Sequence, residues 1–143
     1  MEVEKYSGSN YGGTKKFTQH DVPSANATGF GAAADDYMER GIDLNEQLVA
    51  NKPATFFMRV SGESMIGAGI AAGDIVIVDR SIAPQNGKIV IAIIDGEMLI
   101  RRYQKTMNSL SLVPETPRLS AISITEFTDF KIWGVVTYAI KNV

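Results

Sequence analysis

The segment Ile89–Gln104, which reads IVIAIIDGEMLIRRYQ, contains two apolar runs separated by Asp95-Gly96. Asp-Gly is a strong signal for a two-residue hairpin turn, because both turn positions need a positive φ that these residues tolerate. The segment therefore predicts two antiparallel strands, Ile89–Ile94 and Glu97–Gln104. Since Ile89–Ile94 is apolar on both faces, we expect it to be a central strand. A second tight turn is predicted just before it, at Asn86-Gly87.

Further short runs rich in Ile, Val, Phe and Tyr lie on both sides of this hairpin, with turn residues between them. These runs are Thr55–Val60, Ile75–Val78, Ser109–Pro114, Ile122–Ile124 and Phe130–Ile140. Several short strands at such spacing predict a mainly β body, either a small barrel or a sandwich, with largely antiparallel strands. The last part, Ile132–Ile140, could be a core strand or an interface element. One short helix is expected from about Leu44, capped by Asp43.

Residues 1–31 differ from the rest of the chain in composition. They are rich in Gly, Ser, Asn, Thr and Lys and show no helical or strand period. We therefore expect a flexible N-terminal arm, followed by a β-rich domain over residues 32–143. Phe17 and Phe30 could anchor the arm in a groove or remain solvated.

Composition excludes several classes of function. The 143 residues suit one domain plus an arm, and the chain has no cysteine, which rules out disulfides, thiolate nucleophiles and Cys-ligated metals. His20 is the only histidine, so we expect no metal site and no cofactor. A net charge of −2 argues against a broad basic surface for nucleic acid. Without an apolar run of about 18 residues or a signal peptide, the expected location is the cytoplasm, with no membrane contact.

Ser64 is the candidate nucleophile. The motif Ser61-Gly62-Glu63-Ser64-Met65-Ile66 follows a predicted strand, so its second serine lies just past the strand end, where a hydroxyl can face a cleft. The alternative is an ordinary turn of Gly, Ser and Glu. A serine nucleophile needs a base, and the lone His20 in the arm disfavours a Ser-His-Asp triad. A lysine made neutral by burial remains possible, and the hairpin is the place to look for it.

From Tyr37 to Val143 the chain resembles the LexA-type self-cleaving serine peptidases, and among them the UmuD-like SOS mutagenesis proteins. The matching segments are Ile42-Asp43-Leu44-Asn45, Ser61-Gly62-Glu63-Ser64-Met65-Ile66, Gly69-Ile70, Gly73-Asp74-Ile75-Val76-Ile77-Val78-Asp79, Gly87-Lys88-Ile89-Val90-Ile91-Ala92, Asp95-Gly96-Glu97 and Trp133-Gly134-Val135-Val136. The short arm has no helix-turn-helix, which resembles the UmuD-like proteins rather than the repressors. Direct sequence-specific DNA binding is therefore not expected.

The resemblance implies that Ser64 is the nucleophile and that the chain cuts its own arm at a bond between a small residue and glycine. Thr28-Gly29 is the matching bond. The family usually has Ala or Cys before this glycine, and the β-branch of Thr28 crowds the carbonyl that the serine attacks. Slow cleavage is the expected effect.

Arg101 occupies the position at which the family places its catalytic lysine, counted without a gap through Asp95-Gly96-Glu97. Guanidinium groups have pKa values above about 12 and cannot serve as a base, although Arg101 could orient the serine or neutralise an oxyanion. Lys88 could substitute or be an exposed turn residue, whereas Lys105 is roughly 13 Å farther along the strand. The arginine indicates either a homologue that lost self-cleavage or a chain altered to hold the uncleaved form.

Two functions follow as expectations from the resemblance. In the first, a serine peptidase of the SOS response to DNA damage cuts its own arm and thereby regulates an error-prone translesion DNA polymerase. Its partners are a second copy in a homodimer, the RecA–DNA filament and a UmuC-like polymerase subunit. In the second, the same fold is a non-catalytic adaptor that binds a polymerase or the RecA filament.

Overall fold

The computed structural model describes Glu2–Lys5 and residues 43–143. The chain divides into two compact units, one made of Met1–Gly8 with Asn51–Val143 and the other of Ser9–Ala50. The predicted boundary after residue 31 lies outside the described residues and stays a prediction. In the smaller unit the described secondary structure is the helix α2, Leu44–Leu48. Asp43 caps it by accepting a hydrogen bond from Asn45 N at 2.9 Å, which confirms the predicted helix and cap.

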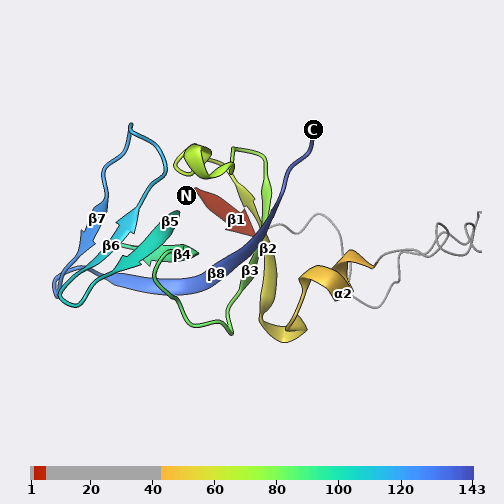
Figure 1. Cartoon of the computed structure of the whole chain (residues 1–143), viewed down its shortest axis with the longest axis horizontal. Helices are drawn as coiled ribbons and strands as arrows, with labels where there is room; N and C mark the ends of the chain where they lie inside the picture. Colours follow the sequence, from red (N-terminus) through yellow and green to blue (C-terminus); the bar gives the residue numbers. More distant parts are fainter. Residues whose placement is uncertain (1, 6–42) are drawn as a thin grey trace, which may run out of the picture. The chain divides into compact units, whose positions relative to one another are not determined.

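The larger unit is one curled sheet of eight antiparallel strands in the order β1-β2-β3-β8-β4-β5-β6-β7 (Figure 1). The strands are β1 Val3–Lys5, β2 Thr55–Val60, β3 Ile75–Asp79, β4 Ile89–Ile94, β5 Glu97–Lys105, β6 Leu110–Val113, β7 Ile122–Ile124 and β8 Phe130–Ile140. Short 3₁₀ turns, Lys52–Ala54 and Ile66–Ala68, precede β2 and β3. The mainly β prediction is confirmed, and every predicted run contains a strand.

The Asp95-Gly96 turn has the predicted geometry, with φ of 50° at Asp95 and 83° at Gly96. It joins β4 to β5 with Ile94 opposite Glu97. Strand β4 lies between β8 and β5, and is therefore central as predicted. In the other predicted turn, Lys88 N donates to the carbonyl oxygen of Gln85 at 3.0 Å, around a glycine with φ of 89°.

Strand β1 was missed by the sequence analysis, which expects no strand in residues 1–31. It pairs with β2, with Val3 opposite Val60 and Lys5 opposite Met58. Val3 is fully buried, and burying a valine side chain contributes about 1.5–3 kcal/mol, which helps offset the cost of ordering so short a strand. Three residues are too few to show a period-2 pattern.

The core consists of two clusters of buried side chains. The first includes Val3, Met58, Val60, Met65, Ile70, Val76, Val78, Ile91 and Ile100, and the second Val90, Ala92, Tyr103, Leu112 and Val135. Strand β8, the long blue strand of Figure 1, serves both clusters. Register shifts opposite Ile77/Val78 and Ile91/Ala92 mark bulges, and bulges bend a strand and increase its twist.

The predicted roles of Ile132–Ile140 are both compatible with the strand's position. Residues 132–135 pair with β4 and residues 135–140 with β3, and Val135, which pairs with both, is buried. At the far end, Tyr138 and Ile140 are 47% and 43% exposed. The core role is confirmed for the first half, and the interface role stays a prediction.

Candidate functional site

Ser64 lies in the loop between β2 and β3, past the end of the strand as predicted. Its side chain is 2% exposed, so the hydroxyl does not face open solvent. Met65, the next residue, is fully buried in the first core cluster and accepts hydrogen bonds at its carbonyl from Ala68 N and Ile70 N at 3.0 and 3.2 Å. The buried neighbour anchors the loop and thereby positions the serine.

A second segment of the chain holds the same loop from the other side. Glu115 N donates to the carbonyl oxygen of Ser64 at 2.8 Å, and Gly67 N donates to the carbonyl oxygen of Glu115 at 2.8 Å. The Glu115 carboxylate is itself held by Arg102 Nε at 2.6 Å. A Cβ at Gly67 would lie 2.6 Å from the Glu115 carbonyl oxygen, so only glycine fits this approach. The serine loop is therefore clamped between the core and residue 115.

Arg101 comes from β5, where it lies opposite Val90 of β4. It is 5% exposed, and an arginine buried so deeply normally has an ionic partner. Its Nη1 donates to Glu2 Oε1 at 2.6 Å and to the carbonyl oxygen of Ile100 at 2.8 Å. Its Nε is buried without a hydrogen-bond partner. The guanidinium is thus neutralised mainly by one carboxylate, that of Glu2.

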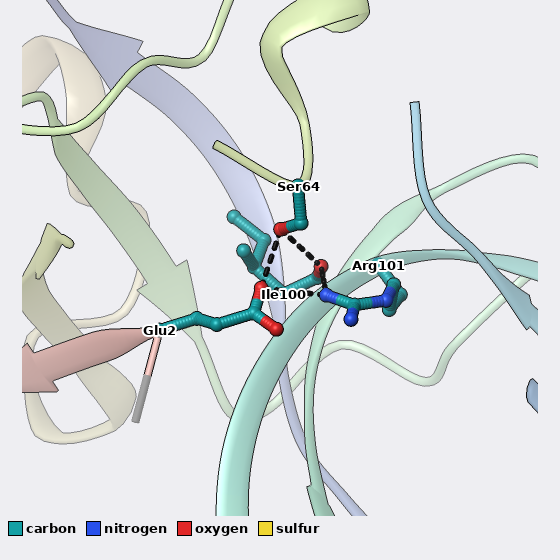
Figure 2. Close-up of polar contacts among 4 residues, drawn as sticks. All are labelled: Glu2, Ser64, Ile100 and Arg101. Carbon is teal, nitrogen blue, oxygen red and sulfur yellow. Dashed lines mark hydrogen bonds and ion pairs between the residues drawn. The ribbon is translucent and has the colours of Figure 1, made fainter. Parts of the chain in front are cut away.

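Glu2 completes the site, as Figure 2 shows. Its Oε1 accepts hydrogen bonds from both Ser64 Oγ and Arg101 Nη1. The same two side chains also meet at the carbonyl oxygen of Ile100, which lies 3.4 Å from Ser64 Oγ. The structure therefore brings the predicted nucleophile and the predicted base position together around two shared acceptors.

Glu2 was not predicted as a site residue from the sequence. The hydrogen bond between Glu2 and Ser64 joins residues 62 positions apart. No motif surrounds Glu2, and the only local signal was an acidic residue beside the apolar Val3. Backbone bonds fix its place: Glu2 N donates to Met98 O at 3.0 Å, and Ser61 N donates to Glu2 O at 2.7 Å.

The alternative lysines are not among the groups bonded to Ser64. Lys88 is exposed in the turn before β4, which agrees with the simpler of its two interpretations, and Lys105 is exposed at the end of β5. Both polar partners of the Ser64 hydroxyl are oxygen atoms, of Glu2 and Ile100. Among the residues that the structure describes, the serine therefore has a carboxylate partner with a guanidinium beside it, and no amine is bonded to it.

Several other predictions concern residues that the structure does not describe. The bond Thr28-Gly29, His20, Phe17 and Phe30 all lie outside Glu2–Lys5 and residues 43–143. Within those described ranges, no cluster of three or more His, Asp or Glu side chains is placed to hold a metal ion. No helix there is long and apolar enough to cross a membrane.

Comparison with known proteins gives consistent matches along most of the chain. A family model described as Peptidase S24-like matches residues 22–137. Protein ImpA of Escherichia coli is 42% identical over 115 residues, which cover 80% of this chain and 77% of that protein. Protein SamA of Salmonella typhimurium is 38% identical over 109 residues, covering 76% of this chain and 75% of its own. LexA repressor 1 of Xanthomonas campestris is 38% identical over 116 residues, or 81% of this chain and 57% of the repressor.

Proposed function

Because this chain belongs to the Peptidase S24-like family, as a UmuD-type member, we propose that it is an SOS-response protein that controls an error-prone translesion polymerase. We propose further that it acts as a binding adaptor and not through Ser-Lys self-cleavage. One observation carries this choice: Arg101 stands at the base position and is paired with Glu2, and none of the lysines that the structure describes is bonded to Ser64. A guanidinium cannot take the serine proton.

The proposed partners follow from the family resemblance. They are a second copy of the chain in a homodimer, the RecA–DNA filament and a UmuC-like polymerase subunit, in the cytoplasm and without direct operator binding. The exposed Tyr138 and Ile140 at the end of β8 support the dimer, because they extend an apolar strand to the surface.

Self-cleavage at Thr28-Gly29 is the second candidate, and the hydrogen bond from Ser64 Oγ to Glu2 favours it. In that reaction Oγ bonds to the Thr28 carbonyl carbon while its proton passes to the Glu2 carboxylate. The C–N bond then breaks as the Gly29 nitrogen takes that proton from Glu2, and water hydrolyses the resulting ester to release residues 1–28 from Ser64. Glu2 would replace the lysine as proton acceptor.

A cleavage assay separates these candidates. The purified full chain is incubated at alkaline pH or with activated RecA filament, and the products are examined by gel and N-terminal sequencing. The adaptor predicts no fragment that begins at Gly29, and predicts that Arg101→Lys restores cleavage. The matched control, Ser64→Ala combined with Arg101→Lys, should be inert. A Gly29 fragment from the unaltered chain that disappears in Glu2→Gln would instead establish the second candidate.

A further inference from the structure

The segment Glu2–Lys5 is held against the sheet in the manner of a bound peptide. Strand β1 is the terminal strand of the sheet and pairs with β2 alone (Figure 1). Extended peptides commonly bind by adding a strand to a sheet edge, where backbone hydrogen bonds supply affinity and pockets for side chains supply specificity. The edge of β2 already receives such a strand from this chain's own N-terminal region.

Two adjacent side chains of the segment lie in different surroundings. Val3 is fully buried and packs in the core cluster that contains Met58 and Val60. Glu2 bonds to Ser64 and Arg101 (Figure 2), and we call these two residues the polar site. An apolar environment beside a partner for a carboxylate is a specific recognition pattern, because each rejects the side chain that fits the other.

The polar site has hydrogen-bonding capacity that Glu2 does not use. Arg101 contacts the carboxylate through Nη1, while its Nε is buried and has no hydrogen-bond partner. A guanidinium presents a planar fork of donors that matches a carboxylate in bidentate fashion. Glu2 therefore leaves one edge of the guanidinium unused, because Nε forms a fork with Nη2 and not with the Nη1 that Glu2 contacts.

We propose that the edge of β2 and the polar site of Ser64 and Arg101 bind an extended protein segment with an acidic residue followed by a β-branched apolar one. Glu2–Lys5 is the resident, displaceable ligand of this site. This site makes the proposed adaptor function more specific, and it rests on that function because an adaptor has a protein as its partner. It also explains why Ser64 is covered: a partner segment enters only when β1 leaves.

Accessibility of the site is measured with the full chain carrying Ser64→Cys. The chain has no other cysteine, so this thiol is unique. Its rate of reaction with Ellman's reagent reports how often the polar site is exposed to solvent. We expect slow reaction, accelerated at least about tenfold by adding Glu2→Ala, since loss of a hydrogen bond to a charged group weakens binding by roughly that factor. Glu4→Gln is the matched control, because Glu4 is exposed, and should leave the rate unchanged.

Binding is measured with the peptide MEVEKYSG, which repeats residues 1–8. Added to the Ser64→Cys/Glu2→Ala chain, it should slow the thiol reaction in a saturable manner. The peptide MQVEKYSG should bind roughly 10- to 100-fold more weakly, and the control MEVQKYSG about as well as the parent. Adding Arg101→Met to the chain should remove the difference between the first two peptides.

Two results would overturn the proposal. In the first, the rate of the thiol reaction equals the rate at which the whole chain unfolds, whatever the residue at position 2. Strand β1 would then leave the sheet only when the chain unfolds. In the second, MQVEKYSG protects the thiol as well as MEVEKYSG does. The polar site would then not recognise a carboxylate. Neither measurement involves cleavage, a polymerase or the RecA filament, so failure here is distinguishable from failure of the adaptor function.

Discussion

Replacing Glu2 with glutamine tests the ion pair on which the site depends. The change removes a 2.6 Å bond between side chains that are 18% exposed at Glu2 and 6% exposed at Arg101. Breaking a fully buried pair costs about 3–5 kcal/mol, because the remaining charge stays buried without a partner. A charge-assisted hydrogen bond alone contributes about 1.5–3 kcal/mol. Since Glu2 is partly accessible to water, we expect a loss of about 2–3 kcal/mol in the free energy of unfolding.

The position of β1 sets an upper limit to this loss. If the strand detaches, water reaches Arg101 and the guanidinium is solvated again. The free energy lost by Glu2→Gln therefore cannot greatly exceed the free energy that holds β1 on β2. That free energy rests mainly on the ion pair and on burial of Val3, which contributes about 1.5–3 kcal/mol.

Urea unfolding followed by fluorescence of Trp133 is the assay. This is the only tryptophan of the chain. It packs against Phe56 at 5.0 Å between ring centroids and beneath Arg80 at 4.5 Å, so it reports on the sheet. The control Glu4→Gln should change the free energy of unfolding by less than about 0.5 kcal/mol, as exposed substitutions usually do.

A double-mutant cycle with Arg101→Met isolates the pair. The structure predicts a coupling energy above about 1 kcal/mol between positions 2 and 101, because the side chains are in direct contact. A Glu2→Gln loss no larger than that of Glu4→Gln, together with a coupling near zero, would refute the ion pair. The polar surroundings of Ser64 and Arg101 would then have to be explained without Glu2.

Three further substitutions test other parts of the frame around the site. Gly67→Ala should destabilise the chain by about 1–3 kcal/mol in urea, since its Cβ would meet the Glu115 carbonyl oxygen at 2.6 Å; a neutral result would show that the serine loop is not clamped. Gly96→Ala should cost about 1 kcal/mol, because this turn residue has φ of 83°; unchanged stability would contradict the turn geometry. Burial raises the pKa of the Asp74 carboxyl, but hydrogen bonds from a backbone amide and from Lys141 outweigh burial and hold the pKa below its usual value of 3.8. The carboxylate therefore stabilises the fold above pH 3.8, and this contribution is lost as the pH falls through the lowered native pKa. Asp74→Asn should be less stable than the parent at neutral pH, with the difference shrinking at acidic pH in urea titrations; a constant difference would refute the assignment.

Local sequence patterns were sufficient for most of the sheet. The Asp95-Gly96 turn and the apolar run Ile89–Ile94 predicted both the hairpin and the central position of β4, and the structure confirms them. These features depend on the turn preferences of a few residues and on the apolar pattern of their neighbours. Both can be read from a short stretch of sequence. The place of Ser64 after β2 followed in the same way.

The surroundings of the serine depended on the tertiary structure. The sequence placed Arg101 at the base position, but its carboxylate partner, Glu2, lies 99 positions away in the chain. A three-residue strand such as β1 has too little pattern to be recognised alone, and it forms only where the assembled sheet offers the edge of β2 and a pocket for Val3. The sequence by itself thus determined the sheet apart from β1, together with the serine and the arginine. Only the folded chain decided that a carboxylate lies between them, because that contact joins segments with no local signal for each other.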